Sequence, residues 1–104
     1  MTRPFAPTCL ILLCSLAVSA PVAARAYTGQ ELAPQAKVTL TQARTIALKA
    51  APGTITDQEL EREPGGSGLR YSFDVKRGAQ TFEVGVDAKT GAVLENKIEG
   101  PNPD

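Results

Sequence analysis

The strongest constraint on this fold is the alternation of apolar and polar side chains in two neighbouring segments, residues 69–76 and 81–87. The apolar positions are Leu69, Tyr71, Phe73, Val75, Phe82, Val84 and Val86. Successive side chains of a β-strand point to opposite faces of a sheet, so a period of two predicts two strands, each apolar on one face. Gly78 lies between them and predicts an antiparallel hairpin.

Two different turns can close this hairpin. If residues 77–78 are the centre of a type I′ turn, Phe73 pairs with Phe82. If residues 78–79 are the centre of a type II′ turn, Val75 pairs with Phe82 instead. Both registers keep the apolar faces aligned, so the sequence leaves the choice open.

Residues 39–51 have a helical period. Small and apolar residues recur there at i, i+3, i+4 and i+7, which predicts a helix whose alanine-rich face lies close to the sheet. These residues are Ala43, Ile46, Ala47 and Ala50. Thr41 is the predicted N-cap. Pro52 and Gly53 end the helix, because proline disfavours a helical conformation in the residue before it.

Two weaker strands complete the predicted sheet. In residues 54–63, Ile55 and Leu60 are five positions apart, so they cannot share one face of a regular strand. Either a bulge in the strand or packing of Ile55 from the preceding turn would reconcile them. Residues 92–97 form a short fourth strand. The predicted fold class is therefore α+β, with one N-terminal helix packed on one face of a small antiparallel sheet of about four strands.

The other segments are predicted to lack regular structure. Residues 27–37 show no period and are interpreted as a flexible N-terminal arm. Residues 64–68 form a flexible Gly-rich loop, and no Lys-Ser or Lys-Thr follows them as in a phosphate-binding loop. Residues 100–104 are expected to be a disordered tail, which leaves residues 38–99 as the folded domain.

The first 26 residues have the features of a secretory signal peptide. Arg3 supplies the positive charge, and an apolar run follows at residues 9–20, which is too short for a membrane span. Cleavage after Ala26 is preferred to cleavage after Ala24. An uncleaved anchor and a lipidated cysteine are the alternatives. The mature protein is expected to be periplasmic or secreted, with no membrane contact after cleavage.

The residue inventory excludes several functions. The chain contains no His, and both cysteines, Cys9 and Cys14, leave with the signal peptide. Imidazole bases, thiolate nucleophiles and His or Cys metal sites are therefore absent from the mature chain, and we expect no catalytic residues, no metal and no cofactor. The whole chain has 11 basic and 11 acidic residues, which argues against a nucleic-acid partner.

Four carboxylates at alternate positions make residues 54–63 a candidate site. Asp57, Glu59, Glu61 and Glu63 share one face of the predicted strand. They form either a cation-binding stripe or a solvated face paired with Arg70 or Lys76 on the next strand. Carboxylates two residues apart on a strand are about 7 Å apart, which is too far to chelate one ion. In a simple meander, residues 54–63 and 92–97 are the two edges of the sheet, and an exposed edge is a candidate surface for a partner peptide, with Glu59, Glu61 and Glu63 on the first edge. Alternatively, the acidic residues there block pairing with another strand.

The second candidate is the turn at residues 87–91, Asp-Ala-Lys-Thr-Gly. It is either a recognition loop or a structural turn. In the structural interpretation Asp87 accepts a hydrogen bond from a backbone N–H two residues on, and Thr90 makes similar local contacts. Gly91 then adopts the positive φ that closes the hairpin.

Several of these segments together resemble a PepSY domain. The similar segments are residues 38–43, Val-Thr-Leu-Thr-Gln-Ala; 52–53, Pro-Gly; 59–63, Glu-Leu-Glu-Arg-Glu; 71–75, Tyr-Ser-Phe-Asp-Val; and 82–94, ending Val-Asp-Ala-Lys-Thr-Gly-Ala-Val-Leu. The resemblance implies an α+β fold and an interaction module without catalytic residues. PepSY domains occur in propeptides of thermolysin-type secreted metallopeptidases and in small envelope proteins, and a role in regulating peptidases has been proposed for them.

The resulting hypothesis is a small exported, non-catalytic binding domain that modulates or inhibits secreted or envelope peptidases. Its partner is then a protein or peptide, with a secreted peptidase as the first candidate. The alternative is an envelope ligand- or cation-sensing module without a peptidase target. The sequence leaves the oligomeric state open.

Overall fold

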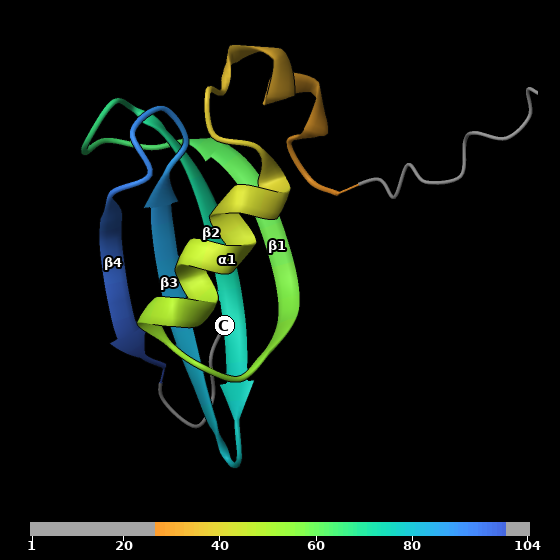
Figure 1. Ribbon diagram of the computed structural model, residues 1–104, viewed down its shortest axis with the longest axis vertical. Coiled ribbons are helices and arrows are strands. Elements are labelled where there is room, and N and C mark those ends of the chain that lie inside the picture. The colour runs from red at the N-terminus through yellow and green to blue at the C-terminus, as the bar shows by residue number, and fades with distance from the viewer. Residues whose placement is uncertain (1–26, 100–104) are drawn as a thin grey trace, which may run out of the picture.

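The computed structural model describes residues 27–99, which form one helix packed across a four-stranded antiparallel sheet (Figure 1). The elements are the 3₁₀-helix η3, Gln30–Gln35; the helix α1, Leu40–Ala50; and the strands β1, Thr54–Arg62, β2, Leu69–Arg77, β3, Gln80–Asp87, and β4, Val93–Ile98. The strands are hydrogen-bonded in the order β1-β2-β3-β4. This confirms the predicted α+β fold. The predicted signal peptide, residues 1–26, and the predicted tail, residues 100–104, lie outside the described residues.

The core lies between α1 and the sheet. Ala43 and Ala47 are fully buried, and the small methyl side chains let the helix lie close to β2 and β3. The strands contribute Leu60, Leu69, Tyr71, Phe73, Val75, Val84 and Val86, all at most 2% exposed. Tyr71 and Phe73 lie side by side with ring centroids 6.3 Å apart. The predicted apolar faces therefore point toward the helix.

The hairpin between β2 and β3 uses the second of the two registers. Val75 pairs with Phe82 and Arg77 pairs with Gln80, so residues 78–79 are the centre of the turn. Gly78 has a φ of 63°, and no non-glycine residue of residues 27–99 has a positive φ. These angles fit a type II′ turn. A type I′ turn at residues 77–78 would force a positive φ on Arg77, which is costly for a residue with a side chain.

The bulge predicted in β1 is present. Its register against β2 shifts between Ile55 and Asp57, so Thr56 is the extra residue. The shift brings Ile55 to the same face as Leu60, where Leu60 is buried and Ile55 packs partly buried against the core. The five-residue spacing of these two side chains is thereby reconciled with a single apolar face.

The predicted N-cap of α1 is wrong, because the helix begins at Leu40 and its cap lies two residues before Thr41. Thr39 is the cap: its hydroxyl accepts from the Gln42 N–H at 3.1 Å, and the Thr39 N–H donates to Gln42 Oε1 at 2.9 Å. This reciprocal pair is a capping box. It forms only when a Gln or Glu lies three residues after the cap, which is true of Thr39 and not of Thr41.

Residues 27–37 do not form the flexible arm that the sequence predicted. The segment contains η3, and the Thr28 carbonyl accepts from the Leu60 N–H of β1 at 2.9 Å. Just after it, the Lys37 and Val38 N–H groups both donate to the Ala88 carbonyl at 2.9 Å. Contacts with distant parts of the chain hold this segment, so it has no internal period that a sequence could reveal.

Candidate functional site

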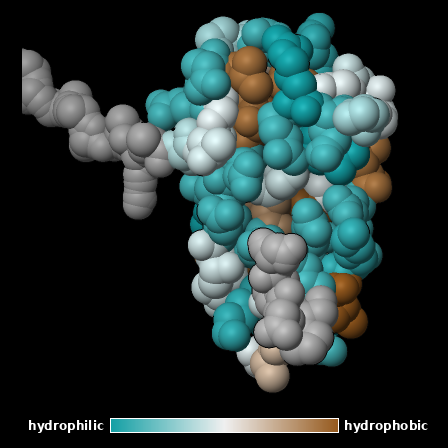
Figure 2. Space-filling model, turned by 180° about the vertical axis from the view of Figure 1, so that it is seen from behind, coloured by the Kyte–Doolittle hydropathy of each residue, from teal (hydrophilic) through white to brown (hydrophobic). Residues whose placement is uncertain are grey.

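The face of the sheet opposite α1 is an acidic hollow. Figure 2, the view from behind the sheet of Figure 1, shows mostly hydrophilic side chains. The hollow has a volume of about 520 Å³. It is lined by Asp57, Glu59, Glu61, Glu63, Ser72, Asp74, Glu83, Glu95, Lys97 and Glu99. Eight of these ten residues are carboxylates, and Lys97 is the one cation among them.

The four predicted stripe carboxylates of residues 57–63 do line this face together, but they lack the predicted cationic partners. Glu61 lies opposite Arg70 in the sheet, yet its carboxylate accepts from the Ser72 hydroxyl at 2.7 Å. Lys76 lies opposite Thr54, at the far end of β1. The predicted pairing of this stripe with Arg70 or Lys76 is therefore wrong, because Arg70 binds across the sheet in the other direction.

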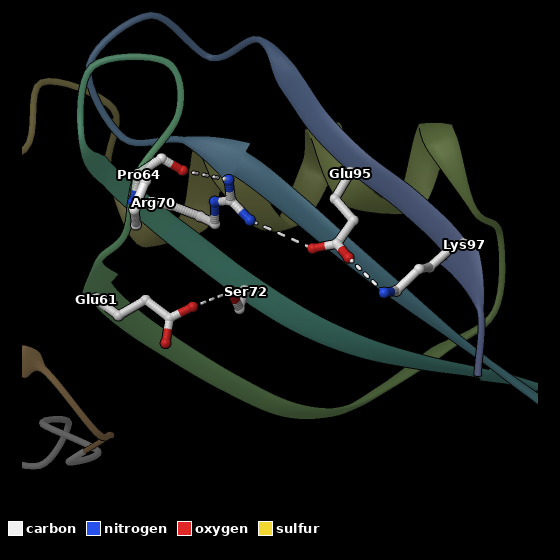
Figure 3. A network of polar contacts seen from close by, with 6 residues as sticks. All are labelled: Glu61, Pro64, Arg70, Ser72, Glu95 and Lys97. Carbon is white, nitrogen blue, oxygen red and sulfur yellow. Dashed lines mark hydrogen bonds and ion pairs between the residues drawn. The ribbon is translucent and has the colours of Figure 1, made fainter. Parts of the chain in front are cut away.

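Arg70 reaches from β2 over β3 to Glu95 on β4 (Figure 3). Its guanidinium lies 3.3 Å from Glu95 and also donates to the Pro64 carbonyl at 3.4 Å. Glu95 in turn holds Lys97 at 3.1 Å. Gly85 lies between the two strands, and a side chain there would contact the Arg70 stem at 3.1 Å. A glycine at this position therefore gives Arg70 its path across the sheet.

On the face of the sheet opposite α1, the open face, burial and then the crowding of carboxylates raise several pKa values. Burial raises the pKa of Glu59, and the negative charge of Glu61 raises it further. Burial likewise raises the pKa of Asp74 and of Glu83, and both also lie close to the negative charge of Glu99. Asp57, Asp74 and Glu83 are cross-strand neighbours in one row, and like charges in that position repel. The open face thus carries an excess of negative charge, which Arg70 and Lys97 offset only in part.

Asp87, the first residue of the candidate turn, is a buried carboxylate, only 1% exposed. It accepts from the Lys89 N–H at 2.8 Å and the Thr90 N–H at 3.1 Å. It also accepts from the Ser67 N–H at 2.7 Å and the Ser67 hydroxyl at 2.8 Å. Burial raises its pKa, but these four hydrogen bonds outweigh burial and lower it to about 2. Asp87 is therefore ionised at neutral pH and ties two loops together.

The rest of the turn supports the start of α1. The Thr90 hydroxyl accepts from the Ala92 N–H at 3.2 Å, and Gly91 has a φ of 82°. A side chain at Gly91 would come within 3.3 Å of Ile46 on the helix. These contacts lie within the turn or join it to other parts of the domain, as predicted if the turn is structural. A recognition role for the turn stays a prediction.

The two edges of the sheet differ. On β1, the strand of the candidate residues Glu59, Glu61 and Glu63, the edge is bridged by Thr28, which binds the Leu60 N–H. At the β4 edge, the Glu99 N–H donates inward, to the Thr81 carbonyl of β3. A partner strand on β1 would have to displace Thr28, and its use as a docking edge stays a prediction.

Within residues 27–99, no group of three or more His, Cys, Asp or Glu side chains is placed to hold a metal ion. The helices of that same part of the chain include none that is long and apolar enough to cross a membrane.

The sequence missed the role of the Gly-rich loop. Ser67 supplies two of the four hydrogen bonds to Asp87, and a side chain at Gly66 would collide with the Asp87 carboxylate. The contact between this loop and Asp87 follows from the register of the β2–β3 hairpin. Arg70 pairs with Asp87, which places the loop before β2 directly beside the turn after β3.

Comparisons with known proteins agree with this architecture. The family model described as "Peptidase propeptide and YPEB domain", PepSY, matches residues 37–97. The chain is 31% identical over 70 residues to "Uncharacterized protein YkoJ" of Bacillus subtilis (strain 168). That match covers 67% of this chain and 41% of the relative, so the chain spans well under half of the relative's length. No solved structure matches significantly.

Proposed function

Because this chain belongs to the PepSY family, we propose that it is an exported binding domain that modulates secreted or envelope peptidases. The observation that carries the proposal is the extent of the family match. Residues 37–97 run from just before α1 into β4, so the match includes the whole helix-and-sheet unit except Ile98, the last residue of β4. The family description names peptidase propeptides, which are segments that contact a peptidase.

The surface of the domain supports a binding role. Eight carboxylates gather on the open face of the sheet, and their repulsion is a cost that a cationic partner surface would relieve. The signature turn is used differently, since Asp87 and Ala88 hold loops and the start of α1 in place. We therefore place the contact with a partner on the sheet rather than on this turn.

The residue inventory supports a role without catalysis. Residues 27–104 contain no His and no Cys, so neither an imidazole base nor a thiolate nucleophile is present. The carboxylates lie on an open face of the sheet, where water has free access. Paired acid and base carboxylates work in a cleft that orients a substrate between them.

The test is capture of a peptidase by the exported protein. The full chain, expressed in its own host with a C-terminal tag, is recovered from envelope and culture fractions, and bound proteins are assayed for peptidase activity in gels. We expect a peptidase to be retained by the wild type. The matched control is Phe73→Ala, which removes a side chain that is only 1% exposed and should unfold the domain.

Two results would contradict the proposal. One is equal retention of peptidases by the wild type and by Phe73→Ala, which would mark the capture as nonspecific. The other is no retained peptidase together with a melting temperature that rises on addition of a divalent cation. That second result would favour the alternative, an envelope ligand- or cation-sensing module.

A further inference from the structure

The outer edge of β4 has backbone groups that point away from the sheet. The Glu99 N–H donates to the Thr81 carbonyl at 2.8 Å, which fixes the hydrogen-bonded pairs of the β3–β4 ladder. In an antiparallel ladder such pairs alternate with pairs whose backbone groups point outward. Asn96 and Ile98 occupy the outward positions, and within residues 27–99 no other backbone group bonds to them.

The opposite edge is already covered. The Leu60 N–H of β1 points outward and is bound by Thr28, and Gly29 lies so close that a side chain there would collide with the Leu60 carbonyl. Farther along, Arg62 donates to Gln35 of η3. A new strand can therefore join the sheet at β4 without displacing any described residue, whereas the end of β1 from Glu59 to Arg62 is covered by the chain itself.

The helix side of β4 offers apolar contacts. Val93 and Ile98 are the exposed large hydrophobic residues of the described chain, at 44% and 53% exposure, and both lie on this one strand. Val93 pairs with buried Val86, and Ile98 pairs with Phe82, so both side chains are on the helix side of the sheet. A neighbouring strand with apolar side chains on that side would cover them.

The side chains on the open side of β4 favour a partner segment with positively charged side chains. Glu95 and Glu99 are on this side, next to Glu83 of β3. Lys97 lies opposite Glu83 and is held by Glu95, so it offsets only part of the negative charge of the neighbouring carboxylates. A second copy of the chain would bring another acidic face alongside, whereas a strand with basic side chains would relieve the repulsion.

We propose that the outer edge of β4 binds an extended segment of a partner protein, with apolar side chains toward α1 alternating with basic side chains toward the open face. The segment adds a fifth strand, bonded to the outward backbone groups of Asn96 and Ile98. That the partner is a protein rests on the proposed function. The new part of the inference is the surface that binds and the kind of segment bound.

The test uses two eight-residue blocked peptides, one alternating Val and Lys and one alternating Val and Glu. Backbone amide signals of the full-length exported protein are followed by NMR and hydrogen exchange. We expect the Val-Lys peptide to shift and protect the amides of Asn96 and Ile98, with Leu60 unchanged. The Val-Glu peptide should leave all three unchanged. Protection at Leu60, or equal effects of both peptides, would overturn the proposal.

Two edge variants form a matched pair. Asn96→Pro removes the outward N–H of β4 and should abolish binding of the Val-Lys peptide. Gln58→Pro makes the same change at an outward position of β1, and should bind as the wild type does. Each variant also loses one side-chain hydrogen bond, from Asn96 to Ala50 or from Arg44 to Gln58, and the melting temperature of each shows whether it is folded.

A third variant covers the case in which a proline variant fails to fold. Ile98→Lys changes a half-exposed side chain, keeps the backbone donor, and should weaken binding about tenfold through lost apolar contact and added repulsion. Unchanged affinity in Ile98→Lys would overturn the proposal. So would concentration-dependent shifts of Asn96 and Ile98 without peptide, which would identify a second copy as the occupant.

The outcomes separate this inference from the proposed function. If the Val-Lys peptide binds at β4 but the exported protein retains no peptidase, the surface is correct and the peptidase role is wrong. If a peptidase is retained equally by the wild type and by Ile98→Lys, the peptidase role stands and the β4 edge is not its surface.

Discussion

Replacing Asp87 with asparagine tests whether the buried carboxylate holds the loop end of the domain together. The change preserves the size of the side chain but removes its charge. One carboxylate oxygen accepts from the Ser67 N–H, and the other accepts from the Ser67 hydroxyl and the Lys89 and Thr90 N–H groups. An asparagine amide can accept with one side only, so its NH₂ group must face at least one backbone N–H. That leaves buried donors without an acceptor.

The expected cost follows from two contributions. A pKa of about 2, against an ordinary value of 3.8, corresponds to roughly 2.5 kcal/mol, which solvent screening near exposed Ser67 reduces to about 1–2 kcal/mol. Leaving a buried donor unsatisfied costs about 1–3 kcal/mol more. We therefore expect Asp87→Asn to lower the unfolding free energy by about 2–4 kcal/mol at pH 7. This is a large share of the 5 kcal/mol or so typical of a small domain.

The pH dependence gives a sharper signature. Because the folded pKa of Asp87 lies below its unfolded value, its contribution is complete above about pH 4 and is lost as the pH falls toward 2. Glu59, Asp74 and Glu83 act in the opposite sense, since their folded pKa values are raised, first by burial. Their protonation relieves repulsion, so stability should rise as the pH falls from neutral to mildly acidic.

The assay is urea denaturation followed by circular dichroism, from pH 7 to pH 2. Wild type should gain stability toward mildly acidic pH and then lose it below about pH 4. Asp87→Asn should also gain stability toward mildly acidic pH, but its stability should fall much less than that of the wild type below about pH 4. The control Glu31→Gln, at an exposed carboxylate of η3, should stay within about 0.5 kcal/mol of wild type. An asparagine variant as stable as this control, with the wild-type acid decline, would refute the reasoning.

Three further predictions test the turn, the open face and the core. Gly91→Val should lower the melting temperature more than Gly91→Asn, because asparagine tolerates the positive φ of 82° better than a β-branched residue; equal losses would show that φ is not the reason for glycine. Asp74→Asn should raise the unfolding free energy by about 0.5 kcal/mol at low salt and less at 1 M salt, because it removes a charge from the acidic row; a loss of stability at low salt would contradict the repulsion. Phe73→Ala should cost about 3–5 kcal/mol in denaturation measurements, whereas Ser72→Ala, on the open face, should cost about 0.5 kcal/mol; similar losses at both positions would mean that the strand faces are inverted.

The elements with a strong local period were predictable from the sequence. The alternation from Leu69 to Val86 specified β2, β3 and their buried faces, and the alanine spacing specified α1. A bulge in β1 was one of the two explanations that the spacing of Ile55 and Leu60 allowed, and the structure contains it. In each case the information lies within a few residues of chain, where side-chain direction follows directly from the backbone.

Features that depend on contacts between distant segments were not predictable. Thr28 binds β1 and Lys37 binds Ala88, so the segment expected to be a flexible arm is held by distant partners. Arg70 was one expected partner of the carboxylates of residues 57–63, and instead crosses Gly85 to reach Glu95. Choosing among several carboxylates requires the register of all four strands, which the sequence left open.

The candidate site was predictable in composition but not in shape. The alternating carboxylates of residues 57–63 were visible in the sequence, and the structure adds Asp74, Glu83, Glu95 and Glu99 to the same face. The outward backbone groups of β4 have no sequence signature, because they follow from strand order and from the covering of β1 by Thr28.

The most direct measurement of the central claim is the rate of a secreted peptidase of the same host during titration with the mature domain. The substrate is an internally quenched peptide, and wild type is compared with Ile98→Lys and with Phe73→Ala. The account predicts a saturable change in rate with wild type, a weaker response with Ile98→Lys and no response with Phe73→Ala. A rate that stays constant across the wild-type titration, for every peptidase of the secreted and envelope fractions, would contradict it.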